Sequence, residues 1–110
     1  MNYQHKDLAS GRWNNMPFLE QMANIGSEVE RALNWQAKHN SAYSQKAVER
    51  ALELIDLSLD NITSPSRLKE LTRVREAIVD FFLEKNQFKS SDALWRAYFL
   101  PFAYAVRRNR

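Results

Sequence analysis

The scarcity of helix-breaking residues is the feature that most constrains the fold of this 110-residue chain. Only two glycines and three prolines interrupt it. No stretch alternates apolar and polar residues in the manner of a half-buried strand. Apolar residues instead recur every three or four positions, which is the period of an amphipathic helix. The sequence therefore predicts an all-α fold.

Four helical segments follow from this period. A polar residue that can cap the helix precedes each of the last three segments, because its side chain can accept a hydrogen bond from a free N–H of the first turn. The expected N-caps are Asn40 or Ser41, Ser64, and Ser90 or Ser91. The expected helices cover residues 16–38, 42–61, 65–85 and 91–108.

The connections between these segments are short, and short loops favour antiparallel neighbours. We therefore expect an antiparallel up-down four-helix bundle over residues 16–110. Pro101 lies inside the fourth helix and should kink or split it. Residues 1–15 are expected to form a polar N-terminal arm with Trp13 as its one anchor.

Several function classes are disfavoured by what the sequence lacks. There is no cysteine, so disulfides, thiolate metal sites and cysteine nucleophiles are excluded. The two histidines, His5 and His39, have no neighbouring ligand at metal spacing, and no glycine-rich phosphate loop is present. No apolar segment approaches the roughly 20 residues needed to span a bilayer. We expect a cytoplasmic protein that is not an enzyme and that binds no cofactor and no metal.

Arg75 is the residue that fits its surroundings least well. It lies within the apolar stripe of the third helix, close to Leu71 and Ile78. An unpaired guanidinium buried there would cost several kcal/mol, so it needs an acceptor. The expected role is a buried structural ion pair between helices, with Glu28 and Glu30 among the candidate partners. The alternative is a small-ligand or catalytic site centred on Arg75.

Charge is unevenly distributed along the chain, whose net charge is +3. Residues 67–110 carry ten basic and five acidic side chains, whereas residues 1–66 carry six and eight. An acidic row on the second helix could form a solvated face or dock a basic partner. The basic half could contact nucleic acid or an acidic partner. Its candidate contact residues are Arg67, Lys69, Arg73, Arg107, Arg108 and Arg110.

The fourth helix carries more large apolar residues than one core stripe requires. Leu100 and Tyr104 are expected to point away from the side of Leu94, Tyr98 and Phe102. Trp35 and Leu57 also lie off the core faces expected for their helices. Apolar side chains left outside the core favour a protein interface, most simply in a homo-oligomer, unless the N-terminal arm covers them.

The runs ANIGSEVERAL, KAVERALELIDLSL and RLKELTRVREAIVDFF resemble small, uncharacterised bacterial helical-bundle proteins. The layout of the chain also resembles the four-helix-bundle family of diversity-generating-retroelement accessory proteins and ribosomal intervening-sequence proteins. That second resemblance implies a basic, oligomeric bundle that binds nucleic acid.

The function expected from the sequence is a non-enzymatic, oligomeric helical-bundle module for protein–protein interaction. A nucleic-acid-binding accessory protein is the first alternative, and a site centred on Arg75 is the second.

Overall fold

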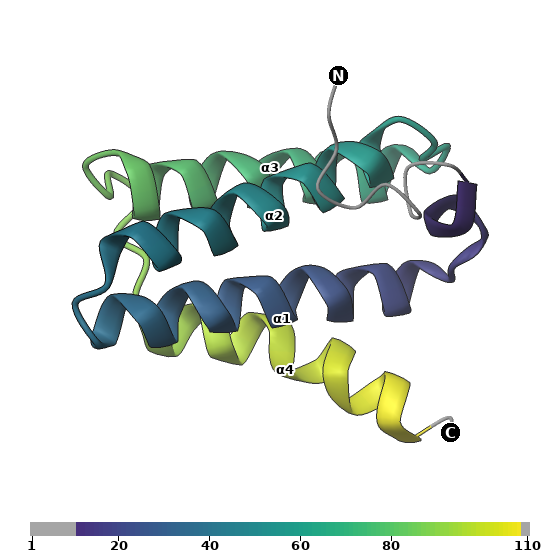
Figure 1. Cartoon of the computed structure of the whole chain (residues 1–110). Helices are drawn as coiled ribbons and strands as arrows, with labels where there is room; N and C mark the ends of the chain where they lie inside the picture. The colour runs from purple at the N-terminus through teal and green to yellow at the C-terminus, as the bar shows by residue number, and fades with distance from the viewer. Residues whose placement is uncertain (1–10, 109–110) are drawn as a thin grey trace.

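Four α-helices make up nearly all of the computed structural model, which describes residues 11–108 and contains no strand within them. A 3-10 helix, η2, precedes them. In Figure 1 the four long helices lie roughly alongside one another. The elements are η2 (Trp13–Asn15), α1 (Phe18–Ala37), α2 (Ser41–Leu59), α3 (Pro65–Leu83) and α4 (Asp92–Arg108).

Polar side chains fix where the last three helices begin. Each accepts a hydrogen bond from a backbone N–H of the first turn, which has no partner inside the helix. The expected caps are thus confirmed, with Asn40 and Ser91 as the capping members of the two candidate pairs and Ser64 as the third cap. The capping bonds run from the N–H of Tyr43 to Asn40 Oδ1 (3.0 Å), of Arg67 to Ser64 Oγ (3.5 Å) and of Leu94 to Ser91 Oγ (3.2 Å).

The helices pack as a chain of neighbours in which α1 and α2 form the centre. Helix α1 packs against both α2 and α4, and α2 packs against both α1 and α3. The outer helices α3 and α4 meet through long side chains. The ring centroids of Phe81 and Trp95 are 6.4 Å apart, and the hydroxyl of Tyr98 donates to Glu70 Oε2 over 2.6 Å. The all-α four-helix fold expected from the sequence is confirmed.

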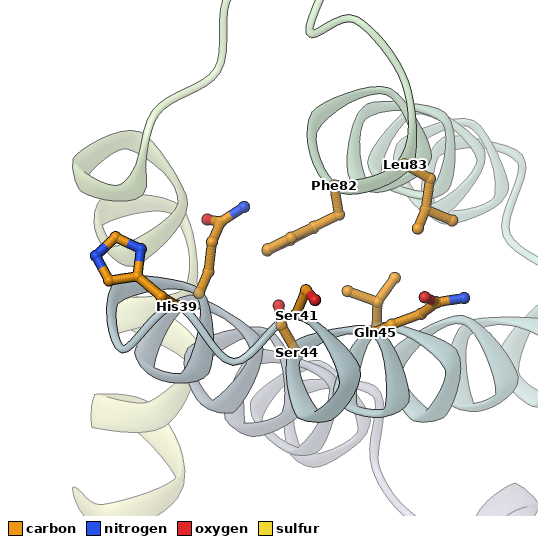
Figure 2. A pocket seen from close by; sticks show the side chains of 8 residues that line it. His39, Ser41, Ser44, Gln45, Phe82 and Leu83 are labelled. Carbon is orange, nitrogen blue, oxygen red and sulfur yellow. The ribbon is translucent and has the colours of Figure 1, made fainter.

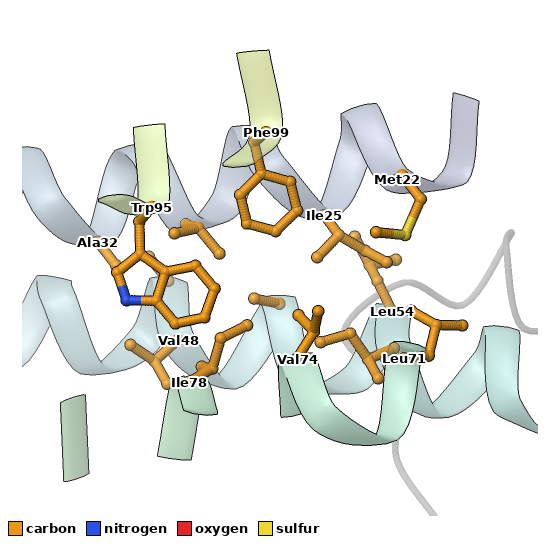
Figure 3. Packing of buried hydrophobic residues seen from close by; sticks show 14 of the residues in the cluster. Met22, Ile25, Ala32, Val48, Leu54, Leu71, Val74, Ile78, Trp95 and Phe99 are labelled. Atoms are coloured by element: carbon orange, nitrogen blue, oxygen red, sulfur yellow. The ribbon is translucent and has the colours of Figure 1, made fainter. Parts of the chain in front are cut away.

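The core lies where the four helices face one another. Figure 3 shows Met22 and Ile25 of α1, Val48 and Leu54 of α2, and the residues of α3 and α4 that meet them. The apolar residues that recur every three or four positions on α1 and α3 face this core. Their fully buried members are Met22, Ile25, Val29, Leu33, Leu71 and Ile78.

Trp13 is completely buried, and it closes one end of the bundle. Its indole N–H donates to Ser58 Oγ over 2.8 Å, and that hydroxyl donates to Gln21 Oε1 over 2.8 Å. The amide of Gln21 then donates to the carbonyl of Trp13 over 2.9 Å. This closed set of bonds ties the end of the expected arm to α1 and α2. Residues 1–10 of that arm lie outside the described residues.

Helix α4 is continuous through Pro101 and is therefore not split. Figure 1 shows that it changes direction along its length and that its C-terminal half diverges from α1. The first half lies close to α1 because Gly26 has no side chain. A Cβ at Gly26 would stand 2.8–2.9 Å from the side chain of Phe99.

Candidate interaction surface

Helix α4 has two apolar faces, and only one of them packs against the other helices. The inner face carries Trp95 and Phe99, which are buried and stack with their ring planes 20° apart. Tyr98 and Phe102 extend this cluster toward α3. The inner face is thus centred on Trp95 and Phe99. The expectation that Leu94 belongs to it is wrong, because Leu94 is 60% exposed.

The outer face of α4 is apolar and open to solvent. Leu100 and Tyr104, which are one helical turn apart, are 61% and 60% exposed. Ala93 and Ala97 are also exposed and fall on the same side of the helix at about 100° per residue. We call these four residues, Ala93, Ala97, Leu100 and Tyr104, the outer strip.

A groove between α1 and α4 runs beside the outer strip. It has a volume of about 560 Å³, and its floor contains Gly26 and Phe99. Leu100 belongs both to the strip and to the rim of this groove. The ion pair between Arg96 Nε and Glu30 Oε2, 3.0 Å apart, links the two helices beside it. A second hollow, which shares Ala23, Ser27 and Ala103 with the groove, continues it toward Arg107.

Two of the four residues expected at an interface, Leu100 and Tyr104, are therefore exposed together. The expectation for Leu57 is wrong, since it is only 7% exposed. Helix α2 is covered by α1, α3 and η2, so its buried arc is wider than one stripe. Trp35 lies near the end of α1 and contacts α2. Its ring is half-buried and meets Tyr43 edge-on, with centroids 4.9 Å apart.

Arg75 forms an ion pair that joins α3 to α2. Its Nε and Nη2 donate to the two carboxylate oxygens of Asp56 over 2.8 and 3.2 Å. The partner is none of the expected candidates. The pair is also not buried, because the Arg75 side chain is 39% exposed and that of Asp56 48%. The hydrogen bond with Asp56 is the main reason that the pKa of Arg75 is raised above its ordinary value.

The wide reach of the arginine side chain explains this correction. The guanidinium lies at the end of a long stem, so it can leave an apolar stripe and meet a carboxylate at the edge of the bundle. The depression that Arg75 lines also contains Glu76, Asp80 and Glu84. This surplus of negative charge disfavours an anionic ligand there.

Glu28 is buried, as a partner of Arg75 was expected to be, but it bonds to other arginines. It is 6% exposed, and its carboxylate accepts from Arg50 Nε of α2 (2.9 Å) and from Arg31 (3.0 Å). Asp80 is also buried and accepts from the N–H groups of Gln87 and Phe88. Both carboxylates therefore hold helices or loops in place.

A hollow of about 380 Å³, lined by both polar and apolar side chains, lies at the end of the bundle where α1 joins α2. Figure 2 shows His39 at one edge, Leu83 at the other, and Phe82 pointing in between. The hydroxyl of Ser44 donates to the carbonyl of Ala32 over 2.9 Å. This bond joins α2 to α1 at the hollow.

The expected nucleic-acid contacts are exposed but lie on different helices. Arg67, Lys69 and Arg73 are on α3, whereas Arg107 and Arg108 are at the end of α4. The Arg67 guanidinium lies 4.6 Å from the centre of the Phe18 ring, at the start of α1. Arg110 lies outside the described residues.

Within residues 11–108, no group of three or more His, Asp or Glu side chains is placed so that it could hold a metal ion. Over the same residues, no helix is both long enough and apolar enough to cross a membrane.

Comparison with known proteins returns no match: no family model, no curated protein and no solved structure matches this chain. Of the resemblance expected from the sequence, the structure supports a small, all-helical protein with four helices, and no family is identified.

Proposed function

We propose that this protein is a non-enzymatic interaction module that binds protein through the outer strip of α4 and the adjoining groove. The observation that carries the proposal is the joint exposure of Leu100 and Tyr104 beside an apolar groove. Large apolar side chains that lie together and are mostly exposed mark interaction sites in soluble proteins. Tyrosine is also enriched at the centres of interfaces, because its ring packs while its hydroxyl stays bonded.

The described part of the N-terminal arm does not cover this surface. Trp13 lies against Ser58 of α2 and Gln21 of α1, and not against α4. Two occupants then have to be distinguished, a second copy of the chain and a segment of another protein. A homo-oligomer is the simplest assembly, and it is the one expected from the sequence.

Site-specific photo-crosslinking tests the proposal whatever the identity of the partner. A benzophenone amino acid replaces Tyr104 in one variant and Thr72, which is exposed on α3, in the control variant. After irradiation in cells that express the chain, we expect protein adducts from position 104 and few from position 72. Equal labelling at both positions, or no adduct at 104, would refute the proposal.

Nucleic-acid binding is the second candidate function. The observation that favours it is that Arg67 and Arg107 border the first turn of α1 from two sides, against Phe18 and beside Glu20. Binding through phosphates would weaken steeply with salt. Fluorescence anisotropy with a labelled oligonucleotide measures this slope. Replacing Arg107 by Ser should reduce it by about one unit, and binding that is absent or insensitive to salt contradicts this candidate.

A further inference from the structure

We infer that the occupant of the outer strip is a second copy of the chain, and that the two α4 helices pair antiparallel around a twofold axis close to Leu100. This inference rests on the proposed function and names the partner for the same surface. A twofold pair buries the same surface on both copies, so that surface must be complementary to itself. The outer strip meets this condition in size, and the charges at the two ends of α4 are complementary in the same pairing.

Complementarity in size comes from the order of residues along the strip. Small residues occupy its first half, Ala93 and Ala97, and large residues its second half, Leu100 and Tyr104. An antiparallel pair centred near Leu100 places Tyr104 of each copy over Ala97 of the other. The two Leu100 side chains then meet near the axis, beside the two α1–α4 grooves. A parallel pair would instead oppose Tyr104 to Tyr104 and Ala97 to Ala97, which leaves gaps beside the small residues.

The charges at the two ends of α4 favour the same direction. Asp92 is in the first turn, whereas Arg107 and Arg108 are in the last. Parallel helices would bring four arginines together at one end. Antiparallel helices place the basic end of one copy near Asp92 and the N-terminal end of the other, where opposite helix dipoles also attract. Charge and shape thus select one orientation.

The absence of cysteine from the chain makes a disulfide test direct, because any thiol is one that has been introduced. A disulfide needs Cα atoms within roughly 7 Å. In the antiparallel pair, residue 100 lies near the twofold axis, so a cysteine there can reach the same position in the second copy. The two Tyr104 positions lie about seven residues apart along the axis, or about 10 Å at 1.5 Å per residue, and cannot meet.

Three single-cysteine variants are therefore oxidised under mild conditions: Leu100→Cys, Tyr104→Cys and Ala97→Cys. We expect Leu100→Cys to form a covalent dimer alone. Tyr104→Cys should form one only when mixed with Ala97→Cys. Thr72→Cys, on α3, is the control and should remain a monomer. Efficient self-crosslinking of Tyr104→Cys would show a parallel pair and would overturn the inferred orientation.

Light scattering of the cysteine-free chain supplies the independent measurement. We expect an average mass that rises with concentration from 12.9 kDa toward twice that value, and a constant 12.9 kDa for Leu100→Lys. Leu68→Lys, on α3, is the matched control and should behave like the unchanged protein. A chain that stays at 12.9 kDa at all concentrations overturns the inference.

The photo-crosslinking experiment then separates the two levels of the argument. An adduct of two identical chains at position 104 supports both the interaction surface and the second copy. An adduct with a different protein, from a chain that is monomeric in light scattering, overturns the second copy while the proposed function stands. If no adduct forms at all, both are overturned.

Discussion

Replacement of Gly26 by alanine tests the contact that holds α4 against α1. In an open helix this change stabilises by about 1 kcal/mol, because glycine has the poorer helix propensity. At Gly26, however, the new Cβ would lie 2.8 Å from Cδ1 and 2.9 Å from both Cβ and Cγ of Phe99. Carbon atoms pack best at about 3.5–4.0 Å. The two helices must therefore separate locally, since Phe99 Cβ cannot move independently of its own backbone.

The magnitude follows from these opposing effects. A separation of about 0.5–1 Å forfeits roughly a quarter to a half of the dispersion energy of each contact across the interface. Adding a methyl group to a packed core typically costs about 1–3 kcal/mol. After the gain of about 1 kcal/mol in helix propensity, we expect Gly26→Ala to lower the free energy of unfolding by about 1 kcal/mol.

Urea unfolding followed by far-UV circular dichroism measures this difference. Ser27→Ala is the matched control, because Ser27 is the next residue in α1 and is exposed. It should leave stability unchanged or raise it by a few tenths of a kcal/mol. If Gly26→Ala raises the free energy of unfolding by about 1 kcal/mol, then α4 does not approach α1 at this glycine and the packing argument fails.

Three further changes probe other parts of the molecule. Trp13→Phe should lower the free energy of unfolding by about 1–3 kcal/mol more than Trp95→Phe does. The reason is that the indole N–H of Trp13 is hydrogen-bonded, whereas the buried N–H of Trp95 has no partner among the described residues. Equal losses of stability for the two variants in urea unfolding would contradict this. Arg75→Met should change the free energy of unfolding by less than about 1 kcal/mol, because its ion pair with Asp56 is partly exposed. A larger loss in thermal unfolding would mean that the ion pair is stronger than its exposure implies. Burial raises the pKa of Tyr98 above 10.0, and the bond to Glu70 adds to this. Above pH 10 the unfolded chain then loses this proton while the folded chain keeps it, so stability falls as pH rises. Tyr98→Phe should show a shallower fall in urea unfolding between about pH 9 and 11, and an unchanged slope would remove Tyr98 as the cause.

The helices and their caps could be predicted because both depend on neighbours in sequence. The period of three to four residues follows from helix geometry alone, and each capping bond spans only three residues. Ser64 followed by Pro65 marks the start of α3 for this reason. The observed bounds differ from the expected ones by no more than two residues at each end.

The burial of individual side chains is harder to predict because it depends on which helices become neighbours. Leu57 is off the main stripe of α2, yet it is buried since this helix packs on three elements. Leu94 has the character of a core residue and is exposed, because Trp95 and Phe99 face α1 instead. A single apolar stripe is a sufficient description only for a helix with one neighbour.

The partners of charged residues are the least predictable feature. The sequence predicts that Arg75 bonds to a carboxylate on another helix, and it does, but the carboxylate is Asp56 and the pair lies at the edge. Glu28, one of the expected partners, bonds instead to Arg50 and Arg31. The side chain of arginine is long and flexible, so each of these arginines could reach more than one carboxylate. Which carboxylate it bonds is therefore decided by how the helix backbones pack.

The strength of the inferred dimer can be bounded from the outer strip alone. Complete burial of a large apolar side chain contributes about 1.5–3 kcal/mol, and Leu100 and Tyr104 are each about 60% exposed. Two such residues on each of two copies therefore supply roughly 4–7 kcal/mol. Association itself costs at least about 4 kcal/mol in lost translational and rotational freedom. Burial of the outer strip alone therefore gives at most a very weak dimer. A micromolar dissociation constant needs a net binding free energy of about 8 kcal/mol, so it requires that the second copy fill the α1–α4 groove as well. Because Gly26 forms the floor of that groove, Gly26→Ala should weaken self-association in addition to lowering stability, whereas Arg75→Met, on the α2–α3 side, should leave self-association unchanged.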